Sequence, residues 1–166
     1  MTPDRRDKTR RRKSAASSTP QARVRPSSDD THEIVYFKRH ADDDRKESVP
    51  AQEFLRSCPE KVRATIQNVL IAVAKAPPKS FAGGGYWEAM HGDMTGWFEV
   101  RVDGPDRRHY RLFCRLDYDA ENQSKPLLVA IAGDSKPFRT TFSPKAYRQV
   151  RALGNEYLAR NPRSII

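Results

Sequence analysis

The sequence has no long hydrophobic run and few of the side chains that build redox centres. No stretch of 18 or more apolar residues occurs in its 166 residues, so we predict no membrane-spanning helix. The N-terminus is basic but lacks the apolar stretch of a secretory signal, and we expect a cytoplasmic protein without a membrane partner. Cys58 and Cys114 lie in apolar contexts without metal-ligand spacing, which favours reduced, inert thiols.

Motifs for nucleotides, metals and nucleophiles are missing as well. The glycines at 83–85 are not followed by the lysine and serine of a phosphate-binding loop. His91 and Asp93 have no further ligand nearby, so we expect neither a metal nor another cofactor. No Gly-x-Ser-x-Gly motif or Cys–His dyad can be identified. What remains is acid–base and charge chemistry, in which cations hold phosphate while carboxylates or histidines move protons.

Positive charge is abundant, and it is spread over two different regions. Residues 1–31 carry nine Lys/Arg against four Asp/Glu, contain no aromatic residue and have only Met1 and Val24 as larger apolar side chains. We predict a disordered basic tail there, because such a segment cannot bury enough apolar surface to offset its ordering entropy. The predicted domain, residues 32–166, keeps 22 Lys/Arg and 17 Asp/Glu and is itself basic. This favours phosphate-rich partners; solubility alone is the alternative.

Hydrophobic periodicity predicts the order strand, two helices, four strands, helix. The strands are expected at 33–39, 86–92, 95–103, 108–118 and 126–133. Two helices within 49–78 are expected to begin near Pro50 and near Ser57, with prolines 77 and 78 at the end, and the last helix follows Ser143. We therefore predict an α+β domain, with an N-terminal helical hairpin and a C-terminal helix packed on a twisted, mostly antiparallel sheet of four to five strands.

Alternation along 99–115 places several basic side chains on one face of this sheet. Val100, Val102, Tyr110, Leu112 and Cys114 share one side, whereas Glu99, Arg101, His109, Arg111 and Arg115 share the other, which we expect to be only partly covered. Arginines on adjacent strands repel one another unless an anion lies between them, so the cluster indicates a bound phosphate. The alternative is a solvated face on which Arg101 pairs with neighbouring acids.

These residue types suit a metal-free ribonuclease. Such an enzyme needs a base for the ribose 2′-hydroxyl, cations for the phosphate and an acid for the leaving 5′ oxygen. The candidates are Glu88 as base; Arg101, Arg111, Lys136 and Arg139 as phosphate ligands, the last two in the loop after the central strand; and His109 as acid.

Each of these assignments has a simpler alternative. Glu88 could be a surface carboxylate paired to an arginine, and His109 an exposed histidine at a turn. Trp87 and Trp97 could stack on RNA bases, with Arg115 as a further RNA contact, although tryptophans more commonly pack in the core.

The ordered segments WEAMHGDMTGWFEVRV, HYRLFCRLD and LLVAIAGDSKPFRTTFSPKAY resemble the RelE/HigB superfamily, the toxins of bacterial toxin–antitoxin pairs and their phage-derived relatives. The matching features are Met90–Gly92, Gly96–Trp97, Glu99–Arg101, Tyr110–Leu112, Leu127–Ala132 and Lys136–Arg139, and the similarity covers about residues 33–160. Two departures stand out. Phe142 occupies a place where members often have tyrosine or histidine, with Tyr147 one helical turn later, and Glu99 replaces a strand lysine.

The resemblance implies a fold of two helices on a twisted antiparallel sheet. It also implies an mRNA endoribonuclease, usually acting on the ribosome and opposed by an antitoxin, for which we expect a helix-turn-helix protein. By position Arg111 would hold the scissile phosphate, Lys136 and Arg139 would form the basic loop, and Glu88 would match the base of some members. Two alternatives stay open: a non-catalytic RNA- or ribosome-binding protein of the same fold, and a phage-derived nucleic-acid-associated accessory protein.

Overall fold

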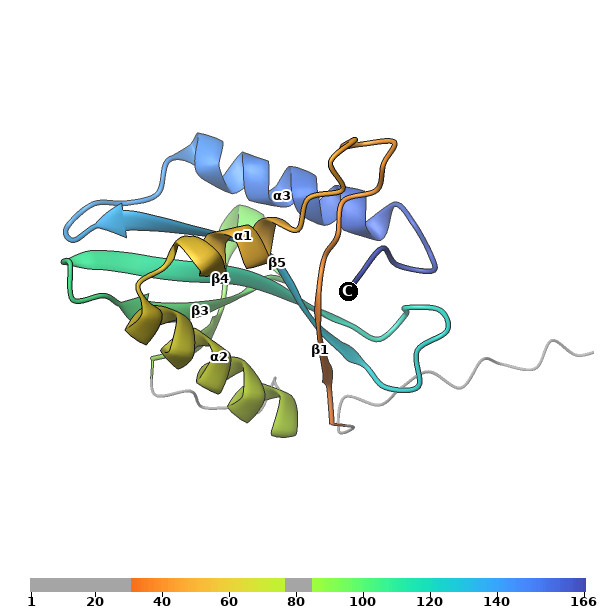
Figure 1. The fold of residues 1–166 in the computed structure, drawn as a ribbon, viewed down its shortest axis with the longest axis horizontal. Helices are drawn as coiled ribbons and strands as arrows, with labels where there is room; N and C mark the ends of the chain where they lie inside the picture. Colours follow the sequence, from red (N-terminus) through yellow and green to blue (C-terminus); the bar gives the residue numbers. More distant parts are fainter. Residues whose placement is uncertain (1–30, 77–84) are drawn as a thin grey trace, which may run out of the picture.

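The computed structural model describes residues 31–76 and 85–166 (Figure 1). The expected disorder of the basic tail therefore lies outside the described residues, apart from residue 31. The elements follow in the order β1 (Glu33–Tyr36), α1 (Pro50–Ser57), α2 (Glu60–Lys75), β2 (Trp87–Ala89), a 3₁₀ turn η1 (Gly92–Met94), β3 (Phe98–Asp103), β4 (Arg108–Asp117), β5 (Leu127–Pro137) and α3 (Pro144–Leu158). This order confirms the predicted α+β class.

The strands form one five-stranded open sheet in the order β1-β5-β4-β3-β2. β1 runs parallel to β5, and the other neighbouring strands are antiparallel. The prediction of a mostly antiparallel sheet of four to five strands is confirmed. The long β4 and β5 lie in the middle, where β5 residues 127–131 are fully buried, as expected for an apolar strand covered on both faces.

The helical hairpin covers one face of the sheet. Proline stands in the first turn of α1, where its missing N–H removes no helical bond. The second helix begins at Glu60, with Pro59 rather than Ser57 at its N-cap position; Ser57 ends α1, and its hydroxyl donates to the Phe54 carbonyl at 2.7 Å. α1 packs on β5 because Gly133 has no side chain; a Cβ there would lie 2.0 Å from Cδ1 of Phe54. The prolines expected to end the second helix lie outside the described residues.

α3 covers much of the opposite face. Its cap is the predicted Ser143, whose hydroxyl accepts a hydrogen bond from the Ala146 backbone at 3.1 Å. Below the helix lies a second apolar cluster, which includes Trp97, Phe113, Val129, Ile131, Val150 and Tyr157. The helix approaches closely at Gly154, where a Cβ would lie 2.4 Å from the Trp97 ring. The arginine face of the sheet is thus partly covered, and Arg111 is buried.

β5 is longer than its apolar run predicts, and this changes the position of Lys136. The strand continues to Pro137, so Lys136 lies on a strand opposite His109 rather than in the expected loop. A β-bulge makes this arrangement possible: Phe113 pairs with Ala132 but Cys114 pairs with Ala130, which leaves Ile131 as the extra residue. Since one extra residue reverses the alternation of the following side chains, Lys136 comes to the arginine face.

Candidate functional site

Strand pairing brings charged side chains together on the face that α3 partly covers. Arg101 of β3 stands directly opposite Arg111 of β4, and Glu88 of β2 stands opposite Glu99 of β3. Lys136 of β5 stands opposite His109, which lies two residues before Arg111 on β4. We call Glu88, Glu99, Arg101, Arg111 and Lys136 the arginine cluster. It unites five residues from four neighbouring strands.

Carboxylates neutralise the two arginines in part. Nη1 of Arg101 lies 2.5 Å from Oε2 of Glu88, so the alternative of a paired Glu88 is correct for this structure. Glu99 lies between the two guanidinium groups, with its oxygens 3.7 Å from Nε of Arg101 and 3.7 Å from Nε of Arg111. These two distances are too long for hydrogen bonds. The cluster therefore holds three cations and two carboxylates, with one positive charge in excess.

Burial shifts the pKa values of side chains in this cluster. The side chains of Arg111 and Glu99 are only 8% and 16% exposed. Burial raises the pKa of Glu99, outweighing the attraction of Arg111 and Arg101. Burial also lowers the pKa of Lys136, and repulsion from Arg111 and Arg101 lowers it further. Arg111 and Glu99 are thus poorly hydrated, and an anion bound between the cations would offset the repulsion among Arg101, Arg111 and Lys136.

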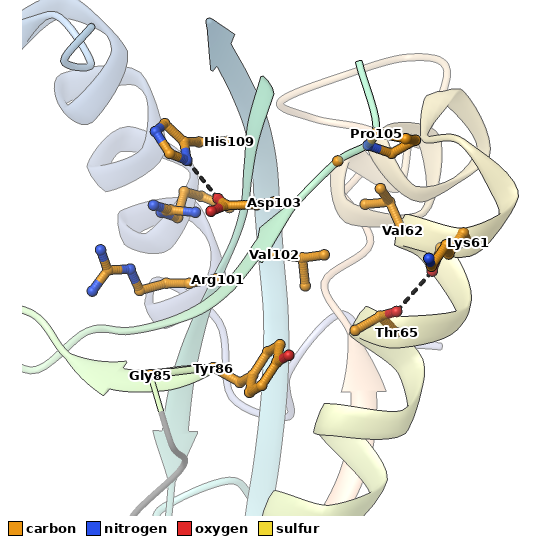
Figure 2. A pocket seen from close by; sticks show the side chains of 12 residues that line it. Lys61, Val62, Thr65, Gly85, Tyr86, Arg101, Val102, Asp103, Pro105 and His109 are labelled. Atoms are coloured by element: carbon orange, nitrogen blue, oxygen red, sulfur yellow. Dashed lines mark hydrogen bonds and ion pairs between the residues drawn. The ribbon is translucent and has the colours of Figure 1, made fainter. Parts of the chain in front are cut away.

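A hollow of about 610 Å³, which we call the cationic groove, opens on one side of the cluster. It curves around the edge of β3, because β2 pairs only with the first three residues of that strand. Figure 2 shows Arg101, Asp103 and His109 on one side of this edge and Lys61 and Thr65 of α2 on the other. Its volume and its basic side chains suit an extended polyanion.

A second hollow of about 500 Å³, the α3 pocket, opens on the other side of the cluster. It lies between the β2–η1 segment and the beginning of α3, and its lining includes Glu88, Glu99, Asp93, Phe142, Tyr147 and Arg148. Neither arginine of the cluster lines this pocket, and neither of its carboxylates lines the groove. The arginine cluster is therefore a ridge that separates two unlike hollows.

The structure places four of the five proposed catalytic residues together and leaves one apart. Glu88, Arg101, Arg111 and Lys136 belong to the cluster. Arg139 is exposed in the turn after β5, with a φ of 61°, and makes no ion pair with another described residue.

The residues expected to contact RNA are less well placed. Trp87 and Trp97 are each 4% exposed, so a role in base stacking does not fit their positions. Trp87 stacks on Phe98, with ring centroids 4.9 Å apart. Arg115 lies over the Trp97 ring at 5.1 Å and lines neither hollow. His109 is the exception, since it lines the cationic groove.

Glu99 is the functional candidate that the sequence analysis undervalued. Alternation placed Glu99 on the arginine face, but the sequence pattern assigned it no role in the site and marked it only as a departure from the family pattern. Its position between Arg101 and Arg111 follows from the register of β3 against β4. Cross-strand register is the observation that could have found it.

Among residues 31–76 and 85–166, no three His, Cys, Asp or Glu side chains gather as metal ligands. Both thiols are buried, and burial raises the pKa of Cys58 to about 11. Over the same residues, no helix combines the length and apolar character needed to cross a membrane.

Comparison of the chain with family models, curated proteins and solved structures returns no match. Support for a function consequently comes from the geometry of the arginine cluster and its two hollows, together with the ordered segments of the sequence.

Proposed function

We propose that this protein is a metal-independent endoribonuclease, the toxin of a toxin–antitoxin pair, which cleaves mRNA on the translating ribosome. The observation that carries the proposal is the order of side chains along one sheet face. Glu99 comes first, the Arg101–Arg111 pair second, and the Asp103–His109 pair third. Successive positions on a strand face are about 7 Å apart. This order supplies a base, a phosphate clamp and an acid in sequence.

The clamp consists of Arg101 and Arg111, with Lys136 beside them. Each guanidinium has five N–H donors. Arg101 uses one nitrogen on Glu88, and Arg111 donates from Nη1 to the Tyr110 carbonyl at 3.0 Å. The remaining donors are free to hold the two non-bridging oxygens of a phosphate and to stabilise the charge that develops there during the reaction.

Glu99 is the general base of the proposed reaction, in place of the expected Glu88. Since Arg101 holds Glu88 at 2.5 Å, that carboxylate positions the clamp. Glu99 accepts no such bond, and burial raises its pKa toward the range in which a carboxylate abstracts protons effectively. It would take the proton of the 2′-hydroxyl as the 2′ oxygen attacks phosphorus, and a 2′,3′-cyclic phosphate would form.

His109 is the proton donor for the leaving group. Its Nδ1 lies 2.5 Å from Oδ1 of Asp103, and its ring lies against Phe138 with centroids 4.5 Å apart. Asp103 orients the ring through Nδ1 and leaves Nε2 without a hydrogen-bond partner among the described residues, so that Nε2 would protonate the 5′ oxygen as the P–O bond breaks. These contacts hold His109 in place, in contrast to the alternative of an unconstrained turn histidine.

Induced expression with mapped RNA ends tests the proposal. Wild-type protein should arrest growth and leave mRNA ends within translated regions. Glu99→Gln and Lys136→Ala should lower cleavage about 100-fold, because each removes a group that acts in the transition state. Arg56→Ala, on the exposed side of α1, is the control and should cleave as the wild type does.

Intact mRNA on translating ribosomes at matched expression would refute the proposed endoribonuclease activity. If the wild type binds RNA without cutting it, the non-catalytic alternative holds instead. An adjacent reading frame for a small helix-turn-helix protein would support the toxin assignment, and its absence would favour the two alternatives.

A further inference from the structure

The α3 pocket adjoins the arginine cluster and is built for a different kind of chemical group. The cationic groove has a cationic lining, whereas the α3 pocket combines aromatic and thioether side chains with both signs of charge. Glu99 forms part of its wall, and the same side chain faces Arg101 and Arg111. A nucleotide whose phosphate lies on the clamp would therefore have its base within reach of this pocket.

The walls of the pocket suit a flat aromatic ring. Phe142 and Tyr147 stand edge to face, with ring centroids 5.9 Å apart, and Met90 and Met94 line the side formed by the β2–η1 segment. RNA-binding proteins hold splayed-out bases against such aromatic surfaces. The volume of about 500 Å³ lies within the range of small-ligand pockets, so a base with its ribose fits.

Two polar side chains of opposite charge line this pocket without partners of their own. Asp93 of η1 and Arg148 of α3 are both exposed, and neither makes a hydrogen bond or ion pair with another residue in the described ranges. Asp93 thus offers two carboxylate acceptors to the pocket, and Arg148 offers guanidinium donors. These unused groups are free to read the edge of a base.

We propose that the α3 pocket is a nucleobase subsite that selects guanine beside the phosphate held by the arginine cluster. The inference rests on the proposed function and specifies its substrate. Guanine carries two adjacent donors, N1–H and N2–H₂, which match the two oxygens of the Asp93 carboxylate. It also carries two adjacent acceptors, O6 and N7, which match the fork of Arg148.

The other bases each conflict with one of these two groups. Adenine presents an amino group where the arginine requires an acceptor, and its N1 is an acceptor that repels the carboxylate. Cytosine likewise places N3, an acceptor, beside its amino group. Uracil has a single N–H between two carbonyl oxygens. Only guanine satisfies both Asp93 and Arg148 without leaving a polar group unpaired, which is how a site rejects close analogues.

Calorimetric titration of the full chain with the four nucleoside 3′-monophosphates tests this inference without requiring cleavage. We expect 3′-GMP to bind about tenfold more tightly than 3′-AMP, 3′-CMP or 3′-UMP. Asp93→Asn should lower the affinity for 3′-GMP to that of the others. Lys136→Ala should weaken all four ligands alike. Glu53→Gln on α1, which also removes one exposed carboxylate, is the charge-matched control.

The outcomes separate this inference from the proposed function. Equal affinities for the four nucleotides, or a guanine preference that survives in Asp93→Asn, would overturn the guanine subsite even if RNA is cut. A preference that Asp93→Asn abolishes, in a protein that cuts no RNA, would support the subsite while refuting the nuclease. Circular dichroism of each variant shows that a loss of binding is not a loss of fold.

Discussion

Two of the partly buried sites at which arginine meets carboxylate differ in how closely the charged groups approach each other. One is the arginine cluster. The other joins β4 to the C-terminal segment and consists of Asp117, Tyr157 and Arg163; we call it the aspartate lock. In the lock, Oδ2 of Asp117 accepts from the Tyr157 hydroxyl at 2.7 Å and from Nε of Arg163 at 2.7 Å. In the cluster, Glu99 comes no closer than 3.7 Å to either arginine.

The difference appears in the pKa of the two carboxylates. Burial alone would raise both. In Asp117, hydrogen bonds from Arg163, Tyr157 and the Asp119 backbone outweigh burial and lower the pKa. In Glu99, burial outweighs the two arginines and raises it. A carboxylate whose bonding capacity is satisfied stabilises the fold, whereas an unsatisfied one beside cations retains donors and acceptors for a substrate.

Asp117→Asn should have the largest effect on stability. The substitution removes the charge that Arg163 faces, and both side chains are less than 10% exposed. Since breaking a buried pair leaves an uncompensated charge, we expect the free energy of unfolding to fall by about 3 kcal/mol. Chemical denaturation measures it. A loss below about 1 kcal/mol would show that the lock contributes no more than an exposed ion pair.

Glu99→Gln, in contrast to Asp117→Asn, should lower activity without lowering stability. Its raised pKa means that the ionised carboxylate weakens the folded state at neutral pH, so its removal should leave the melting temperature unchanged or slightly higher. Cleavage, by contrast, should fall about 100-fold because the base is lost. Stability lost in parallel with activity would place Glu99 with the structural residues and remove the contrast with Asp117.

The unfolding free energies of the two variants should also depend on pH in opposite ways. The lowered pKa of Asp117 means that its stabilisation is present at neutral pH and is lost as the pH falls below the ordinary value of 3.8. The deficit of Asp117→Asn should therefore shrink below pH 3.8. For Glu99 the sign is reversed: any advantage of Glu99→Gln should disappear as the pH falls through the raised pKa, above the ordinary 4.5. Unfolding free energies measured at several pH values test both.

Part of this organisation could be predicted from the sequence. Alternation along β3 and β4 correctly indicated which side chains share a face, because the strand period is a local property. The bulge at Ile131 could not be predicted, since it depends on how β5 pairs with β4, and it decides where Lys136 points. The burial of Trp87 and Trp97 was also undetermined, because an aromatic side chain on a strand suits a core as well as an RNA surface.

The aspartate lock illustrates another limit. Asp117 lies 40 positions before Tyr157 and 46 before Arg163, which follows the helix that carries Tyr157. No local pattern marks them, and only the docking of α3 against β4 brings the hydroxyl to Asp117. The arginine cluster, in contrast, draws on adjacent strands, so its members and the pairing of Glu88 with an arginine could be proposed from the sequence, whereas the position of Glu99 between the two arginines could not.

The smallest expected effect comes from a matched pair of substitutions on α3. Tyr157→Phe removes a hydroxyl that donates to buried Asp117 and should cost about 1–2 kcal/mol of unfolding free energy. Tyr147→Phe removes a hydroxyl from the wall of the α3 pocket and should cost less than about 0.5 kcal/mol, since that hydroxyl makes no hydrogen bond with another described residue. The same variant keeps its ring, so 3′-GMP affinity should remain within about twofold of the wild type. Equal losses of stability in the two variants would mean that the Tyr147 hydroxyl is as fully hydrogen-bonded as the Tyr157 hydroxyl. The distinction between a structural site at the aspartate lock and a substrate-binding site at the arginine cluster would then fail.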